Sequence, residues 1–251
     1  MSGDRTVVVT GAGSPRGIGR ATALRMAADG WAVAVLDRDD VGATAVATEI
    51  ARAGGTALGI TVELTDERAV SAAAREIGQA LPPVAALVNN AGITDPGSFG
   101  STSLHRWREV FAVNVESQFL VTQAFLPGMV QRGVGRVVSV SSAAGQRGGG
   151  YFGGVHYSAS KAAVLGMIKA LAREYAGSGV TFNSVAPGAI ATDITAGAMS
   201  DARRREIEAV TPARRLGDAE EVAAVIGFLC SDDAAFITGA TYDINGGSHI
   251  H

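Results

Sequence analysis

Short apolar segments rich in β-branched residues alternate along the chain with longer, alanine-rich amphipathic stretches. The apolar segments do not place a polar residue at every second position, which is typical of strands buried on both faces of a parallel sheet. The alternation predicts an α/β fold, a Rossmann-type doubly wound parallel sheet of about seven strands flanked by helices. The predicted strands cover 7–10, 32–36, 57–62, 84–88, 136–140, 180–186 and 241–244.

No proline- or serine-rich linker, charge block or internal repeat divides the 251 residues. A chain of about this length fits one large α/β domain. We therefore expect a single dinucleotide-binding and catalytic domain over 1–251.

Composition narrows the function classes. The formal charge is −3 and the sequence pI is about 5.8, so the sequence offers no basic stripe that would bind nucleic acid. No apolar run approaches the ~20 residues that cross a bilayer. The N-terminus lacks a signal-peptide pattern, and the one cysteine, Cys230, lies in an apolar run that predicts a core position. These features predict a cytoplasmic protein with neither nucleic acid nor membrane as partner.

A glycine-rich turn follows the first predicted strand. Residues 10–19 read TGAGSPRGIG and precede a helical stretch. Glycines at such a turn let the backbone approach a pyrophosphate, whose charge meets the free N–H groups of the helix. A P-loop would need Gly-Lys-Ser/Thr, whereas Ile18 follows Gly17 here. The turn therefore predicts a dinucleotide site.

Asp37 ends the second predicted strand, 18 positions after Gly19. A carboxylate there can accept hydrogen bonds from both hydroxyls of the adenosine ribose. At ~5 Å it would repel a 2′-phosphate by about 3 kcal/mol per charge at an effective dielectric of ~20. We expect NAD as the cofactor, with NADP as the alternative, since Arg16 and Arg38 are positioned to pair with such a phosphate.

Tyr157 and Lys161 are four residues apart, so they share one face of a helix. A tyrosine acting as a base near pH 7 needs its pKa lowered by about 3 units, or ~4 kcal/mol. A lysine ammonium at ~4 Å supplies about that much at an effective dielectric of ~20. Ser141 and Ser142 stand at the end of the preceding predicted strand, and this arrangement predicts acid–base chemistry on a hydroxyl or carbonyl group.

Taken together, these motifs resemble the short-chain dehydrogenase/reductase family over essentially the whole chain. Further matching segments are NNAG at 89–92, Asn114 within FAVNVESQF, PG at 187–188, and the C-terminal third. The resemblance implies an NAD(P)-dependent enzyme that interconverts a secondary alcohol and a ketone, in a homotetramer. It also implies roles for four residues. Tyr157 would be the acid/base, and Ser142 would hydrogen-bond the substrate oxygen. Lys161 would lower the pKa of Tyr157 and hold the nicotinamide ribose, while Asn114 would hold a water that links Lys161 to solvent.

Cofactor contacts follow from the same resemblance. Asn90 would line the passage between adenine and nicotinamide, and Ile190 and Thr192 would hold the carboxamide. The full expected cofactor set is Gly11, Arg16, Gly17, Ile18, Gly19, Asp37, Glu63, Asn90, Ala91, Gly92, Tyr157, Lys161, Pro187, Gly188, Ile190 and Thr192.

The sequence departs from the family pattern at three places. Five residues separate Gly11 from Gly17, where the family usually has three, so 13–16 should bulge outward. Ser142 precedes Tyr157 by 15 positions, two more than is typical, which leaves Ser141 as an alternative catalytic serine. Glu63 stands where an aspartate usually contacts the adenine amino group.

Substrate identity is less constrained. The candidate pocket residues are mostly small or polar, which suits a compact polar or polyhydroxy alcohol: Thr94, Gln146, Arg147 and His156, with Asp95, Gly153 and Ala189 nearby. A 3-oxoacyl-thioester reductase is the alternative; basic residues that often serve a carrier protein are absent at Gly133 and Ser178. A non-catalytic NAD-sensing regulator is an alternative of another class. We expect a substrate lid at about 190–212 and no metal, since His249 and His251 lack a third ligand.

Overall fold

The computed structural model describes residues 4–150, 152–196 and 199–250 and contains one seven-stranded sheet. All strands run parallel, in the order β3-β2-β1-β4-β5-β6-β7. The strands are β1 (Thr6–Thr10), β2 (Ala32–Asp37), β3 (Ala57–Thr61), β4 (Val84–Asn89), β5 (Gly135–Val140), β6 (Val180–Pro187) and β7 (Thr241–Ile244). The predicted fold class is confirmed, and the predicted strand ends lie within one residue of the observed ones.

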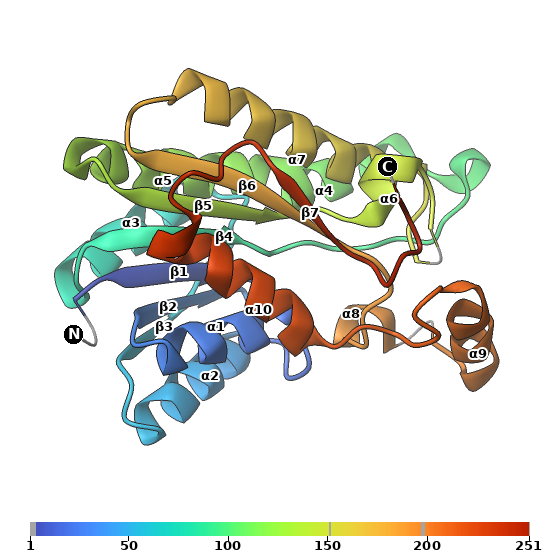
Figure 1. Cartoon of the computed structure of the whole chain (residues 1–251), viewed down its shortest axis with the longest axis horizontal. Coiled ribbons are helices and arrows are strands. Elements are labelled where there is room, and N and C mark those ends of the chain that lie inside the picture. Colours follow the sequence, from blue (N-terminus) through green and yellow to red (C-terminus); the bar gives the residue numbers. More distant parts are fainter. Residues whose placement is uncertain (1–3, 151, 197–198, 251) are drawn as a thin grey trace.

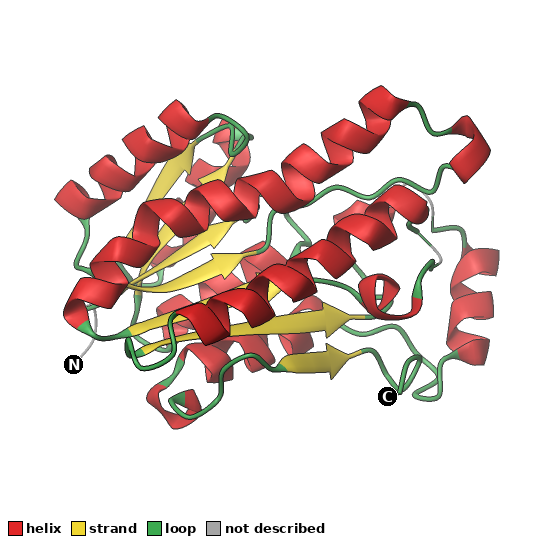
Figure 2. Cartoon of the chain, turned by 90° about the horizontal axis from the view of Figure 1, so that it is seen from above, coloured by secondary structure: helices red, strands yellow, loops and turns green. Residues whose placement is uncertain are grey.

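Helices cover both faces of the sheet (Figures 1 and 2). One face carries α1 (Ile18–Ala28), α2 (Asp40–Arg52) and α10 (Ala219–Cys230). The opposite face carries α3 (Glu67–Ala80), α5 (Ser117–Arg132) and α7 (Val155–Glu174), with α4 (Leu104–Phe111) against α7. None of the described helices is long and apolar enough to span a membrane.

Alternate strand residues supply two separate cores. Val7 and Val9 of β1 face the α1, α2 and α10 side, whereas Val8 faces the other side. Because successive strand residues point to opposite faces, a strand buried on both sides must be apolar throughout. This explains why the sequence pattern lacked alternation, and Cys230 is buried in the first core as expected.

Short elements gather at the carboxyl ends of the strands. They are η1 (Phe99–Ser101), the π-helical turn η2 (Ala112–Glu116), α6 (Ala143–Arg147), α8 (Asp193–Ala196) and α9 (Asp201–Val210). The short helix η3 (Asp232–Ala234) instead lies between α10 and β7. In Figure 1, α9 stands apart from the sheet beyond α8. The strand order reverses between β1 and β4, which creates the crevice where open α/β sheets bind ligands.

Candidate active site

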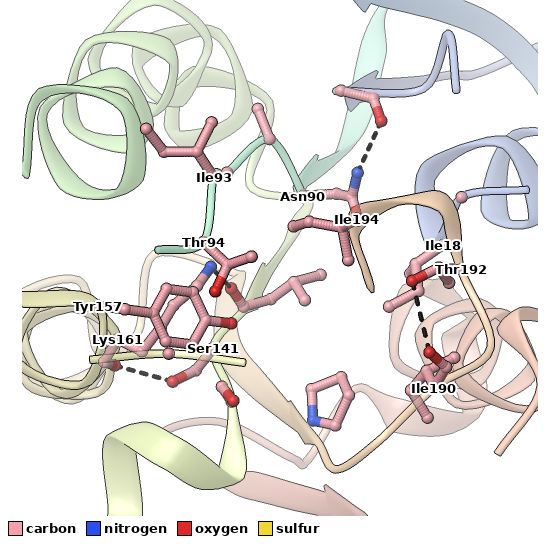
Figure 3. Close-up of a pocket in the computed structure, with 18 of the residues that line it drawn as sticks. Ile18, Asn90, Ile93, Thr94, Ser141, Tyr157, Lys161, Ile190, Thr192 and Ile194 are labelled. Atoms are coloured by element: carbon pink, nitrogen blue, oxygen red, sulfur yellow. Dashed lines mark hydrogen bonds between the residues drawn. The ribbon is translucent and has the colours of Figure 1, made fainter. Parts of the chain in front are cut away.

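A cavity of about 490 Å³ opens at this crevice. Its walls come from the carboxyl ends of β1, β2, β4, β5 and β6 and from the start of α7. Figure 3 shows Tyr157, Lys161 and Ser141 on one side, Ile18, Ile190 and Thr192 on the other, and Asn90 and Ile194 between them. The loop after β3 and the C-terminal segment also contribute, so residues far apart in the sequence converge on one cavity.

The glycine-rich turn forms one end of the cavity. Gly11 has φ +64°, and a Cβ there would lie 2.7 Å from Cα of Ala91. Asn90 Nδ2 donates hydrogen bonds of 2.9 Å to the carbonyl oxygens of Thr10 and Gly11. Gly19 does not line the cavity; a Cβ there would lie 2.5 Å from Asn90 Nδ2, so this glycine lets α1 begin close to the turn.

Helix α1 begins at this turn without a side-chain cap. Gly17 is its N-cap residue and provides no side-chain oxygen for the first N–H groups. Gly17 and Ile18 both line the cavity. Uncapped N–H groups and the positive helix end suit an anion such as a pyrophosphate. The residues present therefore fit the phosphates of a dinucleotide.

Asp37 lies beside the turn and lines the cavity. Its Oδ2 accepts a hydrogen bond of 2.8 Å from the Gly13 N–H, and its Oδ1 accepts one of 3.0 Å from the Asp39 N–H. Two backbone donors thus fix the carboxylate at the cavity wall. Arg38 also lines this wall, whereas Arg16 does not; its guanidinium pairs with Asp193 Oδ1 at 2.7 Å.

Glu63 lies on the expected adenine wall, together with Val62 and Leu64. Its Oε1 accepts hydrogen bonds from the N–H and hydroxyl groups of Thr65, at 3.1 and 2.8 Å. The carboxylate is held by its own loop while it lines the cavity, so an adenine contact remains a prediction.

Ser142, and not Ser141, is the serine that reaches Tyr157. The two side chains are hydrogen-bonded, and Ser142 Oγ also accepts a 3.1 Å hydrogen bond from the Ala144 N–H at the start of α6. Ser141 Oγ instead donates to the Lys161 carbonyl oxygen at 2.8 Å. Adjacent residues at the strand end point to opposite sides, which separates the two hydroxyl groups.

Lys161 is buried close to Tyr157. Its Nζ donates a 2.9 Å hydrogen bond to the Val140 carbonyl oxygen and lies 5.9 Å from the Tyr157 ring centroid. Burial lowers the pKa of Lys161 from 10.5 to about 8. Burial also raises the pKa of Tyr157, against the opposing effect of the Ser142 hydrogen bond. The shift of the Tyr157 pKa is therefore opposite in direction to the one expected from Lys161, because desolvation dominates.

Asn114 is fully buried in the π-helical turn between α4 and α5. Its Oδ1 accepts from the Ile93 N–H at 2.8 Å, and its Nδ2 donates to the Ile93 carbonyl and to Ser160 Oγ, each at 3.0 Å. A Cβ on Gly92 would lie 3.1 Å from Asn114 Oδ1 and 3.3 Å from Lys161 Nζ. The glycine therefore keeps the space between these two side chains open, although Asn114 itself does not line the cavity.

The end of β6 forms the remaining wall of the expected cofactor site, with Pro187, Gly188, Ile190 and Thr192. Ile190 pairs with Gly217 as an isolated bridge, and the Ala191 N–H donates to the Gly217 carbonyl at 2.9 Å. This pairing fixes the backbone that carries Thr192. The wall is thus built from main-chain contacts that the sequence motif alone does not show.

The four substrate candidates separate into two groups. Thr94 and Arg147 line the cavity; Thr94 Oγ1 is hydrogen-bonded to the Phe152 carbonyl, and Arg147 donates to the Ser248 carbonyl at 2.8 Å. Gln146 and His156 do not line it. Gln146 Nε2 donates to Asp243 Oδ1 at 2.7 Å.

His156 faces away because consecutive helix residues point about 100° apart. Its ring is 1% exposed, and Nε2 lies 3.4 Å from Asp95 Oδ2. It lines a smaller hollow with Trp107 and Val155. The hydrogen bond from Arg106 holds the pKa of Asp95 below its usual value.

Sequence reasoning did not assign an individual contact to several cavity residues. Ser14 lies in the predicted glycine-rich turn, and Asp193, Ile194 and Thr211 lie in the predicted lid, whereas Phe152 and Ser248 were assigned to no site. Asp193 directly follows the predicted carboxamide contact Thr192, which was an available signal. No sequence signal pointed to Ser248, because only the tertiary fold brings the C-terminal segment back to the cavity. Among the described residues, no group of three or more His, Cys, Asp or Glu side chains could hold a metal ion.

Comparisons with known proteins agree with this architecture. The family profile described as enoyl-(acyl carrier protein) reductase matches residues 11–249. A short-chain type dehydrogenase/reductase of Sinorhizobium fredii is 43% identical, covering 98% of both chains. The 3-oxoacyl-[acyl-carrier-protein] reductases of Aquifex aeolicus and Escherichia coli are 42% and 38% identical, covering 94% and 98% of both chains.

A solved structure from Beutenbergia cavernae superposes with a TM-score of 0.91 at 40% identity, covering 98% of this chain and 97% of the other. That protein is provisionally assigned as an NAD(P)-dependent gluconate 5-dehydrogenase and holds NADP at low occupancy.

Proposed function

Because the chain belongs to the short-chain dehydrogenase/reductase family, we propose that its cavity interconverts a secondary alcohol and a ketone on a small polar or polyhydroxy substrate. The chain is an NAD(P)-dependent oxidoreductase acting on CH–OH groups. The observation that carries the proposed interconversion of alcohol and ketone is the hydrogen-bonded pair Ser142 and Tyr157 in the same cavity as the glycine-rich turn.

The bound nicotinamide would supply the hydride acceptor during oxidation and the hydride donor during reduction. In the oxidation direction the ionised form of Tyr157, a tyrosinate, would take the proton of the substrate hydroxyl at Oη as the carbinol C–H bond breaks, and in the reduction direction the neutral Tyr157 would return that proton. Ser142 Oγ hydrogen-bonds the same oxygen and positions it. Lys161, buried beside them, would hold the nicotinamide ribose, and the Gly92 space would let Asn114 face Lys161 Nζ.

Arg147 supports a polar substrate, and in particular one that carries a carboxylate. The positively charged side chains among the described cavity residues are Arg38, Arg147 and Lys161. Arg38 belongs to the wall beside Asp37, and Lys161 is buried at the catalytic pair. Arg147 is exposed at the end of α6, five positions after Ser142, and a guanidinium there suits a carboxylate.

The 3-oxoacyl-thioester reductases are a second candidate class, and 42% and 38% identity to two such enzymes favours it. Phe152 and Ile194 give the cavity apolar surface that an acyl chain would contact. Gly133 and Ser178, where carrier-protein enzymes often have basic residues, weigh weakly against a carrier-protein partner.

We also propose that 190–212 acts as a lid over the substrate, within a single domain over 1–251 that assembles as a homotetramer. Asp193 and Ile194 of α8 and Thr211 after α9 line the cavity, which supports the lid. Light scattering of the purified protein tests the tetramer.

A substrate panel tests the proposed function. Purified protein is assayed with NAD(H) and NADP(H) against polyols, sugars, hydroxy acids, 3-hydroxyacyl thioesters and their keto counterparts. Highest kcat/KM on a polyol or hydroxy acid supports the proposal, whereas highest kcat/KM on an acyl thioester replaces it with the second candidate. Cofactor binding without turnover, unchanged in Tyr157→Phe, would indicate a regulator instead.

A further inference from the structure

The turn over 13–16 is tied to the segment after β6 through one side chain, Asp193. The Arg16 side chain donates to Asp193 Oδ1 from Nε and pairs with it through Nη2, both at 2.7 Å. The Arg16 N–H donates to Asp193 Oδ2 at 2.8 Å, and Ser14 Oγ donates to the same oxygen at 3.0 Å. The Asp193 N–H returns a 3.2 Å hydrogen bond to the Arg16 carbonyl.

This set of contacts holds the Arg16 guanidinium in a defined place. The Asp193 side chain is 28% exposed, so the pair is partly shielded from water, although the arginine itself is 72% exposed. Burial would raise the pKa of Asp193, but the hydrogen bonds from Arg16 and Ser14 hold it below its ordinary value. Asp193 is therefore ionised near pH 7 and remains a partner for Arg16.

The same turn also contacts Asp37. The Gly13 N–H, three residues before Arg16, donates to Asp37 Oδ2 at 2.8 Å. A phosphate on the ribose 2′ oxygen, beside Asp37, would lie within reach of an arginine on this turn. Arg38 lines that wall, whereas the Arg16 guanidinium is paired with Asp193, a residue that itself lines the cavity. One of the two candidate phosphate-binding arginines is thus already engaged by a carboxylate.

We propose that Asp193 is a specificity-determining residue for the cofactor: by pairing with Arg16 it withholds a positive charge from a 2′-phosphate and so favours NAD(H) over NADP(H). The proposal rests on the dinucleotide site proposed at Asp37 and is independent of the substrate. Asp193 acts together with Asp37 but by a different mechanism. Asp37 repels the 2′-phosphate, whereas Asp193 binds the arginine that would otherwise pair with that phosphate.

A competing interpretation is that Asp193 only anchors α8 to the turn. Charge and shape can be separated with Asp193→Asn, which keeps the side-chain size but weakens its hold on a guanidinium. Whether an effect acts through Arg16 is answered by the Arg16→Gln and the Asp193→Asn/Arg16→Gln variants. Asp29→Asn is the matched control, because Asp29 pairs with Arg25 on α1 at 2.8 Å, away from the cavity.

The readout is the dissociation constant of NADH and NADPH, measured by fluorescence titration, with 5′-AMP and 2′,5′-ADP as competing probes. Binding requires no turnover, so an error in the proposed substrate leaves the result unaffected. We expect Asp193→Asn to tighten NADPH relative to NADH at least about tenfold and to favour 2′,5′-ADP over 5′-AMP in the same sense. The double variant should lose this gain, and Asp29→Asn should leave the ratio within about twofold of the starting protein.

Three outcomes would overturn the proposal. One is an unchanged NADPH/NADH ratio in a folded Asp193→Asn protein. Another is a gain that persists without Arg16, which would reflect only the loss of a negative charge. The third is a tenfold selective loss of NADPH binding in Arg16→Gln alone, since Arg16 would then already serve the phosphate. This last measurement decides the question even if Asp193→Asn does not fold.

Discussion

A Cβ atom on Gly153 would overlap the ring of Tyr157, with Cδ1 as its nearest atom. The glycine lies in the segment between α6 and α7 and lines the cavity beside the tyrosine. Any larger residue at this position therefore requires the Tyr157 ring or the glycine's own backbone to shift. Gly153 is therefore part of what places the Tyr157 hydroxyl group.

Gly153→Ala should lower kcat at least about tenfold, because a misplaced acid–base group loses much of its contribution. Gly166→Ala is the matched control, since Gly166 lies in the same helix as Tyr157 with no atom within 4 Å of the added methyl group. The control should keep its activity and gain some helix stability. Equal kcat in the two variants would show that the ring has room to move.

Tyr157→Phe should reduce kcat by about 10²- to 10⁴-fold while changing the NAD Kd little, because it removes only the proton-transferring oxygen. Lys161→Ala should lower kcat and also raise the NAD Kd. More than about a tenth of the activity in Tyr157→Phe would contradict the assignment.

The two neighbouring serines should respond differently to substitution. Ser142→Ala should lose activity, while Ser141→Ala should mainly lose about 1 kcal/mol of stability with its buried hydrogen bond to the Lys161 carbonyl. Steady-state kinetics and urea unfolding measure the two effects.

Lys161 makes stability depend on pH. Its pKa is lowered from 10.5 to about 8 in the folded chain, so the unfolded chain binds more protons between these values. The free energy of unfolding should therefore rise with pH in this window and lose this contribution as pH falls through about 8. Between pH 7.5 and 9.5 the rise from this group is about 2 kcal/mol.

Urea unfolding of the starting protein and of Lys161→Met at both pH values isolates this contribution. The starting protein should gain about 2 kcal/mol more than the variant over the interval. Identical pH dependence in the two proteins would mean that Lys161 keeps an ordinary pKa.

Asp37 should make NAD(H) preferred over NADP(H) by at least about 100-fold in kcat/KM, since about 3 kcal/mol of repulsion per phosphate charge exceeds two decades. Asp37→Ala should lose NAD activity and gain NADP activity, with Arg38 as the nearby positive charge on the same wall. The variant also removes the acceptor for the Gly13 and Asp39 N–H groups, so a melting curve accompanies the kinetics. Equal use of both cofactors by the starting protein would contradict the prediction.

Arg147→Gln should raise KM at least about tenfold for a substrate with a carboxylate and leave KM for a neutral polyol within about twofold. The reason is that the guanidinium offers a charge-assisted hydrogen bond only to the acid. Arg52→Gln, an exposed residue at the end of α2, is the control for overall charge. A parallel change in KM for both substrates would indicate that Arg147 serves only its bond to the Ser248 carbonyl.

The fold followed from local sequence patterns because those patterns record burial. A strand that is apolar throughout, such as Val7 to Val9, buries all of its side chains only in the middle of a sheet that is covered on both faces. Tyr157 and Lys161 were equally predictable, since helical periodicity alone puts them on one face.

Other relationships needed the coordinates. His156 was expected in the substrate pocket but faces Asp95, because a neighbour in sequence on a helix points in another direction. The choice between Ser141 and Ser142 depended on how β5 ends against α7. The direction of the Tyr157 pKa shift depended on burial, which charge spacing along the chain does not measure.

By itself, the sequence determined the α/β class, the glycine-rich turn and the chemical groups present, since periodicity and turn chemistry act over a few residues. Tertiary structure alone decided that Arg16 pairs with Asp193, 177 positions away, and that Ser248 returns to Arg147. Such pairs depend on the path of the backbone between distant segments. Their distances and competing partners are properties of the folded chain, so the residue types alone did not indicate that Arg16 would pair with Asp193.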